Sequence, residues 1–175
     1  MVEDAMKSSG TVDEARLAAG AEYVAALEKL GFLVDVALWS IAAHRTGEDS
    51  DLQLCIVSRL VERAGTGELY QLLFRAYDLA ATPRNFDPWN VTLFGPKTRF
   101  AELMKIQPEM LGTAQMEVQG VDGSKHYVEG PMWQMVDDRL MRPEWIYKRQ
   151  FREPNFQSDT TALRRFRANV EKFAA

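Results

Sequence analysis

The sequence predicts an α+β domain, in which a mostly antiparallel sheet of about four to five strands has helices packed on it. Two strongly apolar segments, 32–43 and 52–60, are separated by a short polar loop, a pattern that favours an antiparallel hairpin. Segments with helical spacing of apolar residues surround this pair, and the resulting order αββαβαββαα is typical of the α+β class. A chain of 175 residues that is 46% hydrophobic and 26% charged fits one globular domain.

Each element has its own local signal. Thr11 and Glu14 form a capping box, so we expect the first helix over residues 12–30, and Gly31 is a typical helix end. The remaining elements are expected in chain order: strands 32–43 and 52–60, a helix opened by Gly65 and Gly67, an irregular connector 82–89, strand 91–94, helix 98–106, strands 114–121 and 125–136, a helix from Pro143, and a last helix over 160–173 capped by Ser158 or Asp159.

The charge is unevenly distributed along the chain. Residues 142–175 contain eight Lys and Arg against four Asp and Glu, which gives this segment a charge of +4. The rest contains 13 basic and 21 acidic residues, which gives −8. We therefore expect a single α+β domain over 1–141, with 142–175 as a basic helical C-terminal segment packed on the same domain. Its basic side chains could pair with the acidic body or serve an acidic partner.

Asp35 interrupts an otherwise apolar run. The even-numbered residues of this strand, from Phe32 to Leu38, are uniformly apolar, so they are expected to form the core face. Asp35 then lies on the less buried side, either solvated or paired with an arginine. A catalytic carboxylate needs a partner of matching role, and the neighbouring sequence offers none. We therefore expect Asp35 to be a structural residue whose replacement changes stability little.

Metal, cofactor and membrane functions find no support in the sequence. His44 and His126 are the only histidines and have no ligand spacing, and the acidic loop 48–51 lacks a calcium-binding pattern. Cys55 is the single cysteine, which is typical of a reducing compartment. The opening residues lack the features of a signal peptide, and no run is long enough to span a membrane. We expect a cytoplasmic protein without cofactor or metal, and no catalytic residue is assigned.

Two groups of residues are candidate binding sites. Lys97, Thr98 and Arg99 follow a strand and open a helix, where backbone amides can meet an anion, although the segment lacks the P-loop pattern and Pro96 removes a donor. The alternative is an ordinary strand-to-helix turn. A candidate interaction surface combines aromatic residues of the connector with basic residues of the last helix: Phe86, Trp89, Arg164, Arg165 and Arg167.

A resemblance covers about residues 30–77. The runs VDVALWSIAAH and LQLCIVSRLVERAGTGELYQLLFRAY resemble a pattern in small uncharacterised bacterial proteins. In those proteins an aliphatic-Asp-x-Ala-Leu-Trp strand is followed by a second strand and a Gly-x-x-x-x-Tyr helix, which match 34–39 and Gly65 to Tyr70 here. The second strand of those proteins carries its own Trp, from which Leu52-Gln53-Leu54 departs. The resemblance implies the same α+β arrangement and no known activity.

Three functions are therefore expected in decreasing order. The first is a non-enzymatic interaction or regulatory protein of a bacterial cytoplasm that binds a protein partner or self-associates. The second is a small enzyme that acts on an anionic or phosphorylated substrate through Lys97, Arg99 and His126. The third is a nucleic-acid-associated protein that uses the basic C-terminal helix. A sequence pI near 5.3 does not favour nucleic acid.

Overall fold

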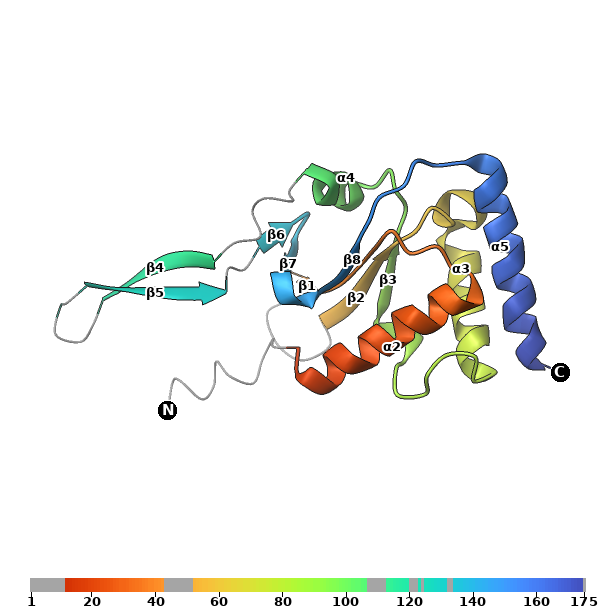
Figure 1. Ribbon diagram of the computed structural model, residues 1–175, viewed down its shortest axis with the longest axis horizontal. Coiled ribbons are helices and arrows are strands. Elements are labelled where there is room, and N and C mark those ends of the chain that lie inside the picture. Colours follow the sequence, from red (N-terminus) through yellow and green to blue (C-terminus); the bar gives the residue numbers. More distant parts are fainter. Residues whose placement is uncertain are drawn as a thin grey trace.

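The computed structural model describes residues 12–42, 52–106, 113–119, 123, 125–131 and 134–174, and it confirms the predicted α+β class. Six described strands form a sheet: five follow the order β3-β2-β1-β7-β6, and β8 pairs with β1 beside this path (Figure 1). Among the described strand pairs of this sheet, only β2 and β3 are parallel. The strands of this sheet are β1 (Val36–Ala42), β2 (Leu52–Val57), β3 (Val91–Phe94), β6 (Gln134–Val136), β7 (Arg139–Met141) and β8 (Ile146–Arg149).

The central strand β1 is covered on both faces. Ala37 and Trp39 belong to a large apolar cluster with residues of α2 (Glu14–Leu30), α3 (Val61–Asp78) and α5 (Phe156–Glu171). Val36 and Leu38 belong to a second cluster, which includes residues of α4 (Arg99–Ile106). The expectation of one core face on this strand is therefore wrong, because the even and odd faces are both buried.

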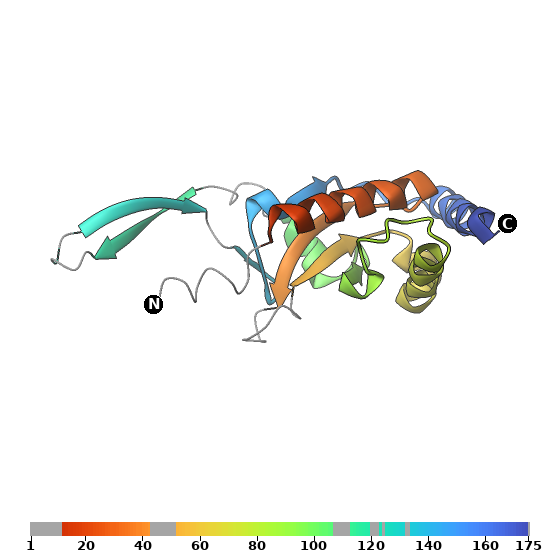
Figure 2. The same ribbon diagram turned by 90° about the horizontal axis from the view of Figure 1, so that it is seen from below.

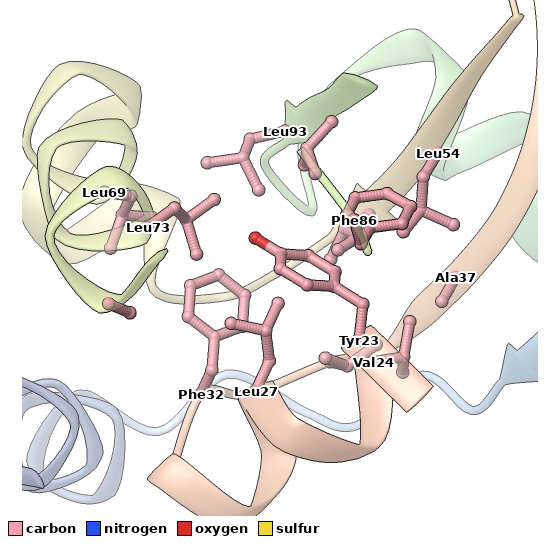
Figure 3. Close-up of a cluster of buried hydrophobic side chains, with 14 of the residues drawn as sticks. Tyr23, Val24, Leu27, Phe32, Ala37, Leu54, Leu69, Leu73, Phe86 and Leu93 are labelled. Carbon is pink, nitrogen blue, oxygen red and sulfur yellow. The ribbon is translucent and has the colours of Figure 1, made fainter. Parts of the chain in front are cut away.

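Figure 3 shows the middle of the larger cluster, between α2, α3 and the sheet. Tyr23 extends from α2 into this cluster, and its hydroxyl points among Phe32, Leu73, Phe86 and Leu93. Tyr23 is fully buried and stacks on Phe86 with 4.3 Å between ring centroids. The hydroxyl has no hydrogen-bond partner among the described residues, and burial raises the pKa of Tyr23 above its ordinary value.

The helix α3 makes the crossover between the parallel strands β2 and β3. It begins with one turn before Gly65, whose φ of 75° kinks the helix, so the start predicted at Gly65 is the start of its second, longer part. Further along α3, the Tyr70 hydroxyl donates to the carbonyl of Val91 and accepts from the amide of Leu93, at 3.1 and 3.0 Å. These two backbone groups belong to β3, at the end of the strand order. Tyr70 therefore occupies the outer side of this edge strand.

Two helix starts differ from the expected caps. The N-cap of α2 is Asp13, whose carboxylate accepts from the amide of Arg16 at 2.7 Å, rather than Thr11, which lies outside the described residues. The N-cap of α5 is Asn155, which accepts from the amide of Ser158, so neither Ser158 nor Asp159 caps this helix. The predicted end of α2 is confirmed: Gly31 adopts a left-handed conformation with a φ of 97°.

The segment from residue 142 is not helical throughout. A single 3-10 turn, Pro143–Trp145, stands where a helix was expected, and the chain continues as β8 against β1. The Tyr147 hydroxyl on this strand accepts from Trp39 Nε1 and donates to the carbonyl of Leu17, each at 2.7 Å. Gly20 faces this pair at a distance that leaves no room for a Cβ. These contacts join β8 to α2 and β1. The sequence pattern did not predict this strand.

The strands β4 (Thr113–Gln119) and β5 (Lys125–Pro131) form a separate antiparallel hairpin. Figures 1 and 2 agree that this hairpin extends away from the sheet and its helices. Its register places Ala114, Met116 and Val118 opposite Gly130, Val128 and His126. Among the helices that the structure describes, none is long and apolar enough to cross a membrane.

Candidate interaction surface

The connector between α3 and β3 carries the most exposed large apolar side chain of the described residues. Ala80 has a φ of 57°, which is rare for a residue with a side chain, and the connector changes direction at this position. Asp87 then caps a 3-10 turn, Pro88–Asn90, by accepting from the amide of Trp89 at 2.9 Å. Pro88 fixes the backbone at the first position of this turn. The connector is therefore an ordered segment that presents its side chains in a defined way.

Trp89 is the most exposed large apolar side chain of the described residues, with 76% of its surface accessible. Its ring lies 4.7 Å from that of Phe74 on α3, measured between centroids. A tryptophan supported on one side by another ring and open on the other can fill a partner's pocket at little entropic cost. The predicted exposure of Trp89 is confirmed.

Phe86 does not share this exposure. Only 4% of its surface is accessible, and its ring contacts those of Tyr23 and Trp39. The expectation that Phe86 belongs to an exposed aromatic surface is wrong, because its side chain fills the core under the connector. Only Trp89 of the two aromatic residues is available to a partner.

A small polar pocket of about 150 Å³ opens where the connector meets α2 and the sheet. Its apolar lining comes from Ala19, Trp39, Leu52 and Phe86. Its polar lining comes from Arg16, Asn85, Asp87 and Asn90. This volume suits a few water molecules or a small polar group rather than a drug-sized ligand.

A larger groove of about 610 Å³ lies between the end of α2, the start of the connector and the end of α5. Its apolar lining is formed by Ala26, Leu30, Ala80, Ala81, Pro83 and Phe173. Phe173 is 53% exposed, and it follows α5 in a short 3-10 turn, Lys172–Ala174. Thr82 is a further lining residue, and its buried hydroxyl has no hydrogen-bond partner in the part of the chain that the structure describes.

Lys29, Arg84 and Lys172 also line this groove. None of the three forms an ion pair with a carboxylate of the described residues. Arg84 donates to the carbonyl of Asp78 and Lys172 to the side chain of Asn169. Three cationic groups without acidic partners therefore surround one apolar depression.

The basic residues predicted on the last helix have different environments. Arg167 forms an ion pair with Glu68 on α3, so this part of the candidate surface is engaged within the chain. Arg164 and Arg165 are exposed and have no ion pair among the described residues. The aliphatic part of Arg165 approaches Gly31, where a Cβ would lie 3.4 Å from Arg165 Cδ. Pairing with the acidic body is therefore observed for Arg167, while Arg164 and Arg165 remain exposed.

The predicted anion-binding residues are also engaged within the chain. Lys97 pairs with Glu62 at 3.1 Å, and Arg99 pairs with Asp137 at 3.6 Å. The Thr98 hydroxyl donates to the carbonyl of Gly95 and accepts from the amide of Ala101, as a helix cap does. These contacts agree with a strand-to-helix turn, and an anion would have to compete with the two carboxylates.

A buried ion cluster holds α5 against the sheet. Asp35 is only 3% exposed, and its Oδ2 atom lies 3.2 Å from Arg59 Nε. Arg59 Nη1 lies 3.0 Å from Asp159 Oδ1 in the first part of α5. The expectation that Asp35 lies on the less buried side of its strand is wrong, because the two faces of this region are both covered.

Backbone groups complete the cluster. The second oxygen of Asp159 accepts from the amide of Asn155 at 3.2 Å, and Arg59 Nη1 donates to the carbonyl of Glu153 at 3.4 Å. Burial raises the pKa of Asp35, while the guanidinium of Arg59 opposes this shift. One buried arginine therefore faces two carboxylates and positions the segment that leads into α5, a structural role.

Cys55 lies in a second buried polar group, on the opposite face of the sheet. Its sulfur is 3.0 Å from the Ser40 hydroxyl, which also accepts from Arg139 Nη1 at 3.2 Å. Burial raises the pKa of the Cys55 thiol, so the sulfur stays protonated and poorly reactive. Within the described ranges, no three His, Cys, Asp or Glu side chains are placed to hold a metal ion. His44 and the acidic loop 48–51 lie outside these ranges, as does the side chain of His126.

Comparison with known proteins adds no relative to this description. No protein-family model matches the chain, and neither the curated proteins nor the solved structures contain a match.

Proposed function

We propose that this chain is a protein-binding module that docks a partner through Trp89 and the connector around it. The observation that carries this proposal is the exposed indole of Trp89, held in place by Phe74 and by the capped turn that Asp87 begins. Tryptophan is enriched among the residues that dominate binding energy at protein interfaces. A fixed backbone reduces the conformational entropy that binding must overcome.

The β4–β5 hairpin supports the same function. A two-stranded hairpin alone is marginally stable in water, and this one extends away from the sheet (Figures 1 and 2). A hairpin of this kind gains stability when a partner, or a second copy of the chain, packs against it.

The alternative functions have weaker support. An enzyme that acts on an anionic substrate would need Lys97 and Arg99 free, and both pair with carboxylates of the chain. A nucleic-acid-associated role would rest on the last helix, where Arg167 is already paired with Glu68.

The test replaces Trp89 with serine and compares the partners captured from the native cell extract by quantitative mass spectrometry. Phe156→Ser is the matched control, because Phe156 is another highly exposed aromatic residue, placed on α5. We expect Phe156→Ser to retain the wild-type partner and Trp89→Ser to recover it at a level lower by about tenfold, the loss typical of an interface tryptophan. Equal recovery by the two variants, with unchanged thermal melts, would remove the basis of the proposal.

A further inference from the structure

We infer that the groove between α2 and α5 binds an extended acidic peptide that places one apolar side chain on the groove floor. This surface is separate from Trp89, and the inference stands on its own observations. The groove has the volume of a ligand site, about 610 Å³, and an apolar lining from three segments of the chain. Phe173 remains half exposed beside it, so part of this apolar surface has no cover in the described chain.

The charge around the groove defines the partner. Lys29, Arg84 and Lys172 surround it without ion pairs to described carboxylates, in a chain whose formal net charge is −4. Elsewhere on the surface, Lys97 and Arg167 have carboxylate partners, and the unpaired Arg164 and Arg165 do not line an apolar groove. Unpaired positive charge beside an apolar floor is complementary to carboxylates that flank an apolar side chain.

The positions of the cations have a second explanation, which is structural. Lys29 is in the last turn of α2, Arg84 donates to the carbonyl of Asp78 at the end of α3, and Lys172 is the C-cap of α5. A helix end carries a partial charge of about −0.5, so three ends offset only about half of three full positive charges. The helix ends alone therefore do not neutralise the three cations that line the groove.

An acidic peptide fits this arrangement better than a nucleic acid does. The floor is lined by alanine, leucine, proline and phenylalanine side chains, which gain free energy by covering apolar atoms. A sugar-phosphate backbone would satisfy the cations and leave most of this floor uncovered. A peptide satisfies both parts, because carboxylates and an apolar side chain alternate along the same short segment.

The experiment measures fluorescence anisotropy of a short labelled peptide with a central leucine between glutamates, added to the full chain. Two control peptides replace the glutamates by glutamines or the leucine by glycine, and a single-stranded oligonucleotide serves as a competitor. We expect either peptide change to weaken binding by about tenfold, and high salt to weaken binding of the two peptides that contain glutamate but not of the glutamine peptide. Equal binding of the glycine peptide, or full displacement by the oligonucleotide, would overturn the inference.

Variants connect the binding to the groove. Lys29→Glu combined with Lys172→Glu should weaken binding of the glutamate peptide by at least about tenfold. Arg164→Glu is the matched control, since Arg164 is an exposed cation of α5 outside the groove lining, and it should change affinity less than about twofold. If the double variant unfolds, Lys29→Gln with Lys172→Gln replaces it. Wild-type affinity in a folded double variant would mean that these cations serve only the helix ends, and the inference would fail.

Discussion

Two buried regions of this molecule differ in whether their polar groups have hydrogen-bond or ion-pair partners. Next to β1, Arg59 forms ion pairs with both Asp35 and Asp159, and backbone groups bond the second oxygen of Asp159 and the guanidinium. Between α2 and α3, the Tyr23 hydroxyl is equally buried and has no hydrogen-bond partner among the described residues. The first region uses polar groups to hold a helix in place, while the second carries an uncompensated desolvation cost.

Burial of a polar group therefore does not by itself indicate whether the group stabilises or destabilises the fold. A group with partners leaves those partners unsatisfied when it is removed, so its loss is destabilising. When a group without hydrogen-bond partners is removed, no other polar group loses a hydrogen bond, and the removal can stabilise the fold. Substitutions in the two regions should therefore differ in sign as well as in size.

Arg59→Met should produce the largest effect. Methionine retains the apolar stem but leaves Asp35 and Asp159 buried together without a cation. The expected loss is about 4 kcal/mol in the free energy of unfolding, the cost typical of a buried charge that loses its partner. Chemical denaturation measures it, with the exposed Arg164→Met as control. A loss as small as that of the control would mean that the cluster contributes nothing to stability.

Asp35→Asn should have an intermediate effect, because it leaves Arg59 and Asp159 as a balanced pair. The amide oxygen can still accept from Arg59 Nε, so we expect a loss of about 2 kcal/mol near neutral pH, as for one charged hydrogen bond. Thermal and urea unfolding of the two proteins give the value. A change within experimental error would mean that Asp35, although buried, is dispensable for stability, as the sequence analysis expected.

The pH dependence of the same variant tests the environment of Asp35. Burial raises the pKa of this carboxyl above its usual value of 3.8, so protonation favours the folded state. The stability that this group contributes is full below pH 3.8 and decreases as pH rises through the raised pKa. The deficit of Asp35→Asn relative to wild type should therefore widen as pH falls from neutral towards 4. A deficit that narrows on acidification would indicate a lowered pKa instead.

Tyr70→Phe should cost about 1 kcal/mol, since the lost hydroxyl leaves a carbonyl and an amide of β3 without their side-chain partner. Val91 and Leu93 are both buried, so water replaces little of the lost interaction. The measurement is the midpoint of urea unfolding, combined with light scattering as a function of protein concentration. Unchanged stability and unchanged association would show that Tyr70 does not protect this edge.

Tyr23→Phe should produce the smallest effect and the opposite sign. It removes an unpaired hydroxyl and keeps the stacking on Phe86, so we expect a gain of about 0.5 kcal/mol. The comparison with Tyr70→Phe is direct, because both variants delete one tyrosine oxygen. A loss of stability on Tyr23→Phe would reveal a partner for this hydroxyl and would end the contrast between the two regions.

The sequence predicted the hairpin of β1 and β2, the short strand β3 and the last helix because each has a strong local signal. It failed for Asp35, since alternation of side chains cannot tell a strand covered on one face from a central strand covered on both. A usable signal existed: Arg59 also interrupts an apolar run, and two opposite charges in two neighbouring strand segments suggest a buried pair.

Other features had no local signal. The strand β8 contains basic and aromatic residues that are typical of an exposed segment. Its pairing with β1 depends on contacts between residues that are more than a hundred positions apart in the sequence. The groove at the ends of α2 and α5 arises from three segments that only the folded chain brings together. Phe86 and Trp89 are three residues apart in one connector, and their opposite exposure follows from the direction of the turn between them.

The Arg59 cluster also affects the order of events during folding. Asp159 is 100 positions from Arg59, so the cluster closes a long loop, and contacts of this kind form slowly. During synthesis, β1 and β2 can pair early, but Arg59 lacks its second carboxylate until residue 159 has left the ribosome. The nascent sheet therefore remains incomplete at this position until α5 has been synthesised, and the docking of α5 supplies the missing carboxylate.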